Sequence, residues 1–296
     1  MKILFYMEST PLHKHRQILE KFCQSVKGDM THSLNYEKCD VAVVFGSWKK
    51  ESKKEWKIVN KHHALKNKIF MNHRGPLIVI ETPLLGRTIT DNHEYHRVGL
   101  GHFMRELGDF KNKNSKPDRF DKLGLKIKPW RNPNNKDGHV LIVGQNMYDA
   151  SLFGIDFEWW VMNTIMTLMK HTKRKIIFRD HPENKKKMKQ IINEKFSWTG
   201  QVEYSGEGKI NDDLKKAHCT VSFTSGSSID SILAGVPVIT CSEYNFLWPI
   251  SSHSLEEVEY PKLGDREQLL YDLAYAQWSV KEICEGKPWK HLIDEN

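Results

Sequence analysis

Cysteine is scarce in this sequence, and its pattern excludes two kinds of structural site. The five cysteines are Cys23, Cys39, Cys219, Cys241 and Cys284, an odd number in which no two have C-x-x-C spacing. Disulfide frameworks and zinc sites need paired or clustered cysteines, so we expect neither here. A reducing cytosol is the expected compartment, with the thiols in the core or inert on the surface.

Long apolar runs and metal-binding motifs are also missing. No stretch approaches the roughly 18 consecutive apolar residues of a membrane-spanning helix, so we expect no stable membrane insertion. The apolar run at 1–8 is too short for a secretory signal and is typical of a first β-strand. There is no Asp-x-Asp motif, and His93, His96 and His102 lack the partners of a metal set. We therefore expect no obligatory metal or other cofactor.

Positive charge is in excess. The formal net charge is +8 and the isoelectric point is about 9.0. Lysines gather at 49–57, 111–116 and 185–187. This balance favours association with polyanions such as nucleic acid, although a solvated lysine-rich surface explains it equally well.

Short apolar strands alternate with helical stretches, which is typical of α/β units with parallel sheets. The expected strands lie at 2–7, 41–45, 77–81, 140–143, 175–179, 201–204, 219–224 and 236–240. A length of 296 residues accommodates two domains. The segment 129–138, rich in proline and asparagine, is typical of a linker. We expect an N-terminal domain at 1–130, a C-terminal domain at 131–270, and a helical segment at 271–296 that could pack back on the first domain.

A serine-rich turn at 225–228 follows one of these strands and opens a helix that Gly235 ends. Open α/β sheets bind ligands outside the carboxyl ends of their strands. A helix that starts there offers unpaired N–H groups to an anion. We expect phosphate binding by Ser225, Gly226, Ser227 and Ser228. A plain serine cap on a βαβ crossover is the alternative.

Other segments that follow strands of the second half add candidates for the same ligand. They are Gly144, Gln145, Arg179, His181, Trp248, Ser252 and His253. A guanidinium can bridge two phosphate oxygens, which is the role expected for Arg179. Trp248 could pack on a base or a sugar, with hydroxyl or phosphate contacts from its neighbours. For each of these residues a purely structural role stays open.

The combination of these motifs resembles the donor half of GT-B-fold glycosyltransferases, in particular capsule-polysaccharide and related sugar transferases. The resemblance rests on His181-Pro182, the turn at 225–228 with Asp230, and 234–238. It implies two Rossmann-like domains that face each other across a cleft, with a nucleotide-sugar, preferably a UDP-sugar, as co-substrate. It also implies phosphate contacts for Arg179, His181 and the serines. The sequence departs from the pattern at Asp180, where capsule-type enzymes often have proline.

A broader similarity links the chain from about residue 76 onward to phage-type proteins, through segments near 81–87, 117–120, 129–131, 142–145 and 274–289. This similarity implies an enzyme that glycosylates 5-hydroxymethylpyrimidines of double-stranded phage DNA in the host cytoplasm. A duplex acceptor would suit the positive charge. Its phosphates could be contacted by His73, Arg74, Arg87, Arg97, Lys111, Lys113 and Lys116. The alternatives are transfer to a surface polysaccharide or lipid-linked sugar, and a non-catalytic nucleotide- or nucleic-acid-binding protein.

Inverting sugar transfer needs a carboxylate that takes the proton from the acceptor hydroxyl. Glu81, at the end of an expected strand, is the first candidate, and Asp91 and Glu8 follow. The alternative is that Glu81 orders its loop through Arg87 or Arg97.

Overall fold

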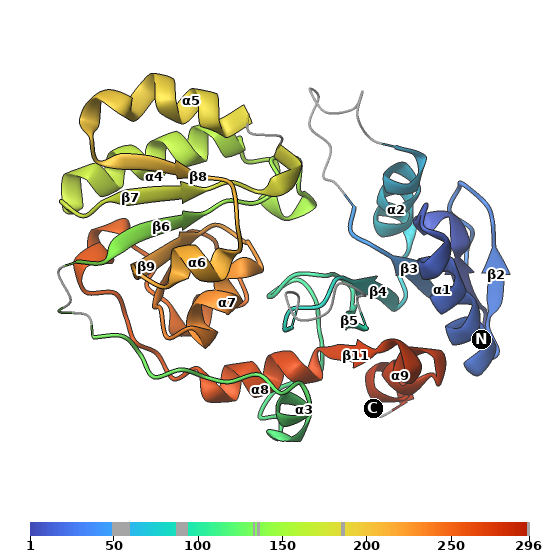
Figure 1. The fold of residues 1–296 in the computed structure, drawn as a ribbon. Helices are drawn as coiled ribbons and strands as arrows, with labels where there is room; N and C mark the ends of the chain where they lie inside the picture. Colours follow the sequence, from blue (N-terminus) through green and yellow to red (C-terminus); the bar gives the residue numbers. More distant parts are fainter. Residues whose placement is uncertain (49–59, 87–93, 133, 135–136, 185–186, 295–296) are drawn as a thin grey trace. The chain divides into compact units, whose positions relative to one another are not determined.

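The computed structural model describes residues 1–296 except 49–59, 87–93, 133, 135–136, 185–186 and 295–296. The chain divides into two compact units, one formed by Met1–Leu123 with Leu270–Asn296 and the other by Gly124–Leu269. Each unit is built around a sheet of its own (Figure 1). The fold is thus α/β with two Rossmann-like units, as the sequence predicts.

Unit 1 holds a six-stranded sheet in the order β11-β5-β4-β3-β1-β2. Its strands are β1 (Ile3–Tyr6), β2 (Asp29–Thr31), β3 (Val41–Phe45), β4 (Leu77–Glu81), β5 (Tyr95–Leu100) and β11 (Gln277–Ser279). The first four are parallel to one another, whereas β5 is antiparallel to both β4 and β11. The apolar runs of β3 and β4 are buried almost throughout, as expected for strands covered on both faces.

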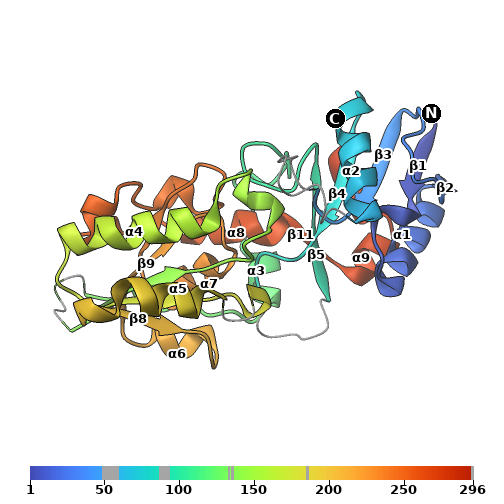
Figure 2. The same cartoon turned by 90° about the horizontal axis from the view of Figure 1, so that it is seen from above.

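The helices of unit 1 cover both faces of this sheet. They are α1 (His13–Ser25), α2 (Lys61–Asn72), α3 (Asp118–Lys122), α9 (Val280–Cys284) and α10 (Lys287–Trp289), with α8 (Glu267–Tyr275) beginning just before the unit boundary. Residues of α1 and of the C-terminal segment share one hydrophobic cluster with the sheet. Figure 2 shows the same elements from above.

Three strands of unit 1 are absent from the strands that the sequence predicts, namely β2, β5 and β11. The helical segment expected at 271–296 is interrupted at Gln277–Ser279, which pair with β5 as β11. Ser279 caps the next helix with a capping box to Glu282, so the chain must leave α8 before that residue.

Unit 2 holds a five-stranded, fully parallel sheet in the order β10-β9-β6-β7-β8. The strands are β6 (His139–Val143), β7 (Ile176–Arg179), β8 (Val202–Ser205), β9 (Ala217–Ser222) and β10 (Val238–Thr240). The helices are α4 (Phe157–His171), α5 (Lys187–Phe196), α6 (Ile210–Leu214) and α7 (Ser227–Leu233).

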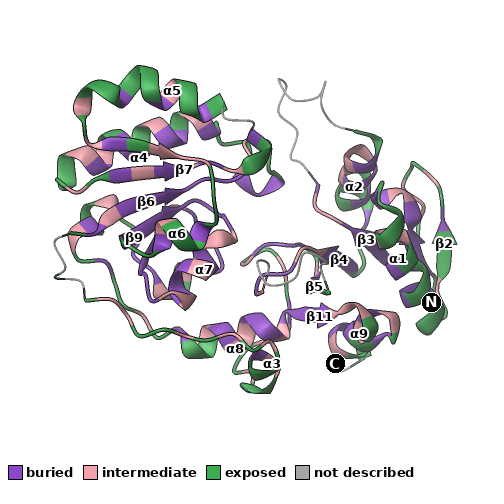
Figure 3. Ribbon diagram, in the orientation of Figure 1, coloured by how far each residue is buried: buried purple, intermediate pink, exposed green. Residues whose placement is uncertain are grey.

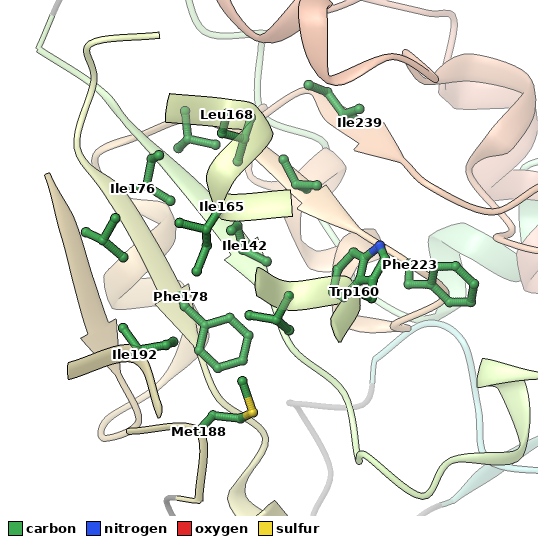
Figure 4. Close-up of a cluster of buried hydrophobic side chains, with 14 of the residues drawn as sticks. Ile142, Trp160, Ile165, Leu168, Ile176, Phe178, Met188, Ile192, Phe223 and Ile239 are labelled. Carbon is green, nitrogen blue, oxygen red and sulfur yellow. The ribbon is translucent and has the colours of Figure 1, made fainter. Parts of the chain in front are cut away.

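Alternation along β6 divides the core of unit 2 between the two faces of the sheet. Val140 and Ile142 belong to a cluster with α4 and α5, which Figure 4 shows around Phe178, while Leu141 and Val143 belong to a cluster with α6. The two clusters fix the strands between two helical layers, so the loops at the strand ends have a rigid support.

Candidate functional site

The strand order of unit 2 reverses at β6. From this first strand the chain proceeds outward to β7 and β8, then crosses to β9 and β10 on the other side. Ligands of open α/β sheets bind at such a switch point, outside the carboxyl ends of the two strands that flank it. The loop after β6 and the turn between β9 and α7 therefore form the candidate site, which we call the switch-point site (residues 144–151 and 223–227).

A buried side-chain network joins these two loops. The side-chain oxygen Oε1 of Gln145 accepts from the Thr224 N–H at 3.1 Å, and its side-chain nitrogen Nε2 donates to the Ser151 hydroxyl at 3.1 Å. The Thr224 hydroxyl donates to the Ser151 carbonyl at 3.1 Å. Gln145 is only 3% exposed. The prediction that Gln145 contacts the ligand is therefore corrected, because its amide is engaged inside the protein and holds the Ser turn in position.

Gly144 completes this support. A Cβ atom added there would lie 2.6 Å from the Arg179 carbonyl oxygen, a distance that real side chains do not reach. The Gly144 N–H in turn donates to that same carbonyl at 2.8 Å. The loop after β6 thus passes directly over the end of β7, and only glycine fits this approach.

The serine turn presents fewer groups than the sequence predicts. The Ser225 hydroxyl donates to the Gly144 carbonyl at 3.3 Å, and the fully buried Ser228 hydroxyl donates to the Ser225 carbonyl at 2.7 Å. The expected phosphate contact of Ser228 is therefore corrected to a role within the turn. Gly226 and Ser227 are half-buried and remain accessible. Asp230, in the first turn of α7, is half-buried and places a negative charge near the same end.

Arg179 has a partner set of its own. Its guanidinium forms an ion pair with Asp213 and donates to the Gly208 carbonyl at 2.6 Å and to the Glu207 carbonyl at 3.3 Å. These contacts connect the end of β7 to the loop that precedes α6. The guanidinium is thus partly engaged by the protein, and its predicted phosphate contact stays a prediction.

His181 lies in a loop that the network also reaches. Asp180 is buried, and its carboxylate accepts from the His181 N–H at 2.8 Å and from the Asn184 amide at 2.7 Å. The Asn184 side-chain amide also donates to the main-chain carbonyl of Gln145 at 3.1 Å. The loop after β7 is thereby joined to the switch-point site, with the His181 side chain half-buried at its surface. Asp180, where the resemblance expects proline, is the residue that organises this loop.

The loop after β10 is built on its own contacts. The rings of Trp248 and His253 stack with centroids 3.5 Å apart, and the Ser252 hydroxyl donates to Glu257 at 2.8 Å. Ser252 is 2% exposed and also accepts from the Lys262 N–H at 2.9 Å. The predicted ligand contact of Ser252 is corrected accordingly. Trp248 stacks on His253, and whether either also contacts a donor stays a prediction.

Three residues that hydrogen-bond in or next to the switch-point site are absent from the site residues predicted from the sequence: Ser151, Asn184 and Thr224. Each acts through hydrogen bonds to residues far away along the chain, such as Thr224 to Gln145. All three are small polar residues buried in the segments that follow β6, β7 and β9, and a single sequence does not reveal their burial.

Unit 1 has a switch point of its own, between β1 and β3. The Ser9 hydroxyl accepts from the Phe45 N–H at 2.9 Å and joins the two strand ends. Glu8 lies beside it, with its carboxylate 3.1 Å from the Arg16 guanidinium and 3.6 Å from the His32 ring. Of Glu8 and Glu81, the two candidate bases that the structure describes, Glu8 is the one placed at this switch point.

Glu81 ends β4 opposite Arg97 on β5. Its carboxylate accepts from the Thr82 N–H at 2.7 Å. Burial alone would raise its pKa, but Arg97, that N–H group and Lys66 together lower it. An ionised carboxylate held this way is a weak proton acceptor, so the geometry favours the alternative in which Glu81 orders its surroundings through Arg97. Asp91 and Arg87 lie outside the described residues.

Lys66 is a buried cation whose charge interacts with that of Glu81. It is 5% exposed, and its ammonium donates to the Phe45 carbonyl at 3.3 Å. Burial lowers its pKa to about 8, while the charge of Glu81 acts in the opposite direction.

Arg97, one of the residues expected to contact DNA, lies opposite Glu81, whereas the other described members of that set do not share the edge where these carboxylates lie. His73 is buried and its ring bonds to the Pro76 carbonyl, which corrects its expected role. Arg74 is exposed just before β4 begins, and Lys111 follows Asp109, which pairs with the last residue of β5. Both therefore lie near the amino end of β4, whereas Glu81 is at its carboxyl end. Lys113 and Lys116 are exposed in the loop that continues from there.

Within the described ranges, no group of three or more His, Cys, Asp or Glu side chains is arranged to hold a metal ion. Over the same ranges, no helix has both the length and the apolar character that crossing a membrane requires.

No protein-family profile matches the sequence. No curated protein matches it either. Among solved structures, the fold is similar to Thermosulfurimonas dismutans KpsC described as a beta Kdo 2,4 transferase, with a TM-score of 0.53, 11% identity, and coverage of 93% of this chain and 90% of that one. It is also similar to KpsC of the same organism described as a beta Kdo 2,7 transferase, with a TM-score of 0.50, 12% identity, and coverage of 98% and 100%. At such identities the likeness shows the fold alone, which is that of GT-B-type sugar transferases.

Proposed function

We propose that this chain is a nucleotide-sugar-dependent glycosyltransferase that binds its donor at the switch-point site of unit 2. The observation that carries the proposal is the buried network of Gln145, Ser151 and Thr224, which fixes two loops at the position where open α/β sheets bind nucleotides. Hydrogen bonds in a buried polar network offset the cost of desolvating its groups only when every group is paired. A fully paired network makes the site rigid.

The donor phosphates would be held by the accessible groups around this network. Gly226 and Ser227 offer backbone N–H groups at the turn, and His181 offers a ring nitrogen from the neighbouring loop. A half-buried Asn146, whose amide bonds Glu183, lies in the loop after β6. The leaving phosphate could be stabilised by these donors without Arg179, which the fold itself uses.

For the acceptor we propose a surface polysaccharide or a lipid-linked sugar. The likeness to two KpsC transferases, whose descriptions name Kdo as the sugar, supports a carbohydrate acceptor. The DNA acceptor has no such support. Arg74 and Lys111 lie near the amino end of β4, and Glu81 lies at its carboxyl end. The deprotonating carboxylate is proposed to be Glu8, with Glu81 as the second candidate.

Nucleotide release from a panel of nucleotide-sugars, UDP-sugars first, tests the donor half of the proposal. Wild-type protein should release nucleotide slowly by hydrolysis, and Thr224→Val should weaken donor binding roughly tenfold, the effect of losing one or two buried hydrogen bonds. Thr240→Val is the matched control, because Thr240 in β10 is also a buried threonine and its hydroxyl is hydrogen-bonded to the Ser251 hydroxyl. Equal donor affinity in the two variants would contradict the proposed site.

Two substitutions test the acceptor half. Glu8→Gln should abolish transfer to an acceptor and leave donor binding intact, because it removes the proton acceptor and nothing in unit 2. Glu81→Gln should leave transfer measurable but destabilise unit 1, since Arg97 and Lys66 lose their counter-charge. The opposite outcome would return the role of base to Glu81.

A further inference from the structure

Unit 1 contains a cavity of about 220 Å³ that is lined by residues of α1, β5 and α9. We call it the α1–α9 cavity, and its polar lining residues are Lys14, His15, Gln17, Lys21, His96 and Cys284. The first, third and fourth of these are exposed and spaced at i, i+3 and i+7, so they share one side of α1. Figure 3 shows exposed residues interspersed with buried ones along this helix. The cavity therefore follows the exposed side of α1, where a ligand can reach it from solvent.

The two helices approach each other closely just beyond the cavity. A Cβ atom added at Gly286, two residues after Cys284, would lie 2.8 Å from the Ser25 hydroxyl at the end of α1. Burial raises the pKa of the Cys284 thiol, and the charge of Lys21 acts in the opposite direction. Lys21 and Cys284 thus lie near each other, and the contact between Gly286 and Ser25 closes the cavity on that side.

Two histidine rings form another wall, and the fold holds both of them. The His15 ring stacks on Phe45 with centroids 3.9 Å apart, and its Nδ1 lies 3.2 Å from the Thr10 hydroxyl. His96 is 2% exposed, and its ring stands edge-on to Phe45 at 5.0 Å. Because Phe45 ends β3, this wall lies beside the switch point of unit 1, where open α/β sheets bind ligands. Rings fixed in this way cost little further ordering when a ligand binds.

Positive charge predominates in the lining. None of the lining residues is acidic. Across the part of the chain that the structure describes, the ammonium groups of Lys14 and Lys21 form no ion pair or hydrogen bond. The two residues are about 10.5 Å apart along α1, so their long, flexible side chains can converge on one group between them. The first turn of α1 also lacks an acidic residue and a side-chain cap, which favours an anion near that end.

The acidic residues nearest to the lining in sequence do not reverse this balance. Two of them are neutralised in ion pairs at 3.0 Å, namely Glu282–Arg119 and Glu285–Lys287. Glu20 lies about 100° or more around α1 from the residues that line the cavity. Glu94 is exposed in the segment before β5, where water and salt screen its charge. The lining thus keeps an excess of positive charge.

Charge and volume together indicate the class of ligand. Two ammonium groups match the charge of about −2 on a phosphate monoester, whereas a carboxylate would compensate only one of them. The cavity is far larger than the ~10–15 Å³ that one water molecule needs, and smaller than the roughly 300 Å³ at which pockets for drug-sized ligands begin. Ile18 and Val280 line the remaining wall beside the Gln17 amide. Apolar groups and one amide suit the C–H and hydroxyl groups of a small polyol.

We propose that the α1–α9 cavity binds a small phosphorylated polyol of the size of a hexose phosphate. The ammonium groups of Lys14 and Lys21 would bind the phosphate, as lysine commonly does, and Gln17 would bond a hydroxyl group. The proposal concerns unit 1 alone and does not depend on sugar transfer at the switch-point site.

Calorimetric titration of the full chain with glucose 6-phosphate tests it. We expect saturable binding that is tighter than that of inorganic phosphate and absent with glucose. Lys14→Gln with Lys21→Gln should lower the affinity about tenfold or more, because charge-assisted hydrogen bonds are lost. Val280→Phe keeps every charge but fills the cavity, and should lower the affinity to a similar extent. Lys38→Gln with Lys290→Gln is the matched control, since it removes two exposed lysines of unit 1 that do not line the cavity.

The outcomes separate this proposal from its rivals and from the proposed enzyme function. Wild-type protein that does not bind glucose 6-phosphate would overturn it, as would lysine variants that fold normally by circular dichroism and bind like wild type. Tighter binding of glucuronate would assign the cavity to a carboxylate, and equal binding of inorganic phosphate would assign it to a free ion; either result overturns the proposal. Nucleotide release should be unchanged in Lys14→Gln with Lys21→Gln, so failure of either proposal leaves the other standing.

Discussion

Replacing Gln145 by leucine removes the side chain that joins the two loops of the switch-point site. The substitution keeps the size of the side chain but leaves the Thr224 N–H without its acceptor at 3.1 Å, and it removes the donor to the Ser151 hydroxyl. A buried donor left unsatisfied costs about 1–3 kcal/mol. We expect the free energy of unfolding to fall by about 2–4 kcal/mol, since a second buried hydroxyl also loses a partner.

The same substitution should weaken donor binding, because the Ser turn is no longer held against the loop after β6. Urea unfolding measures the first effect, and calorimetric titration with a nucleotide-sugar, well below the unfolding temperature, measures the second. Thr240→Val serves as the control for a lost buried hydrogen bond in the same unit. Gln145→Leu protein that is less stable yet binds donor like wild type would show that the network supports the fold alone, and the reasoning would be refuted.

Three further predictions address single features of the two units. Gly144→Ala should destabilise the chain by about 1–3 kcal/mol in urea unfolding, because its Cβ would lie 2.6 Å from the Arg179 carbonyl; an unchanged midpoint would contradict the close approach. Arg179→Met should cost about 1–3 kcal/mol of stability, because the half-buried Asp213 keeps only the Ser205 hydroxyl as a side-chain donor, with donor affinity in calorimetry unchanged; a large loss of affinity would assign Arg179 to phosphate binding. Lys66 has a pKa lowered by burial to about 8, so the unfolded chain binds more protons than the folded one between that pH and about 10.5. Its contribution to the free energy of unfolding should therefore rise with pH across this window, by up to about 3 kcal/mol, and a pH series in which Lys66→Met keeps the wild-type slope would reject it.

The fold class could be read from the sequence because the parallel strands are dense apolar runs. VAVVF in β3 and HVLIV in β6 are both buried nearly throughout, and a buried parallel strand needs this composition. The strand β5, YHRVGL, lacks such a run, although it lies between β4 and β11, and three of its six residues are only half-buried. Its short partner β11 is defined only by pairing with residues about 180 positions away, which no local pattern encodes.

The candidate site was predicted in position but not in detail. The alternation of strands and helices predicts that the Ser turn and Gly144 lie at one edge of the sheet. It does not predict the direction of each side chain. Arg179 and Gln145 are polar residues at strand ends, as a ligand contact would be, yet both are engaged by buried or half-buried protein partners. Only the folded arrangement distinguishes a residue that supports a site from one that contacts the ligand.

Mass spectrometry of transfer products tests the central claim most directly. The purified chain would be incubated with a panel of nucleotide-sugars and, in parallel, with an oligosaccharide, a lipid-linked sugar and hydroxymethylated DNA. We predict a mass gain of one sugar on a carbohydrate acceptor, with matching nucleotide release that Gln145→Leu suppresses. A mass gain on the DNA alone would contradict the proposed acceptor, and no nucleotide binding or release with any donor would contradict the account as a whole.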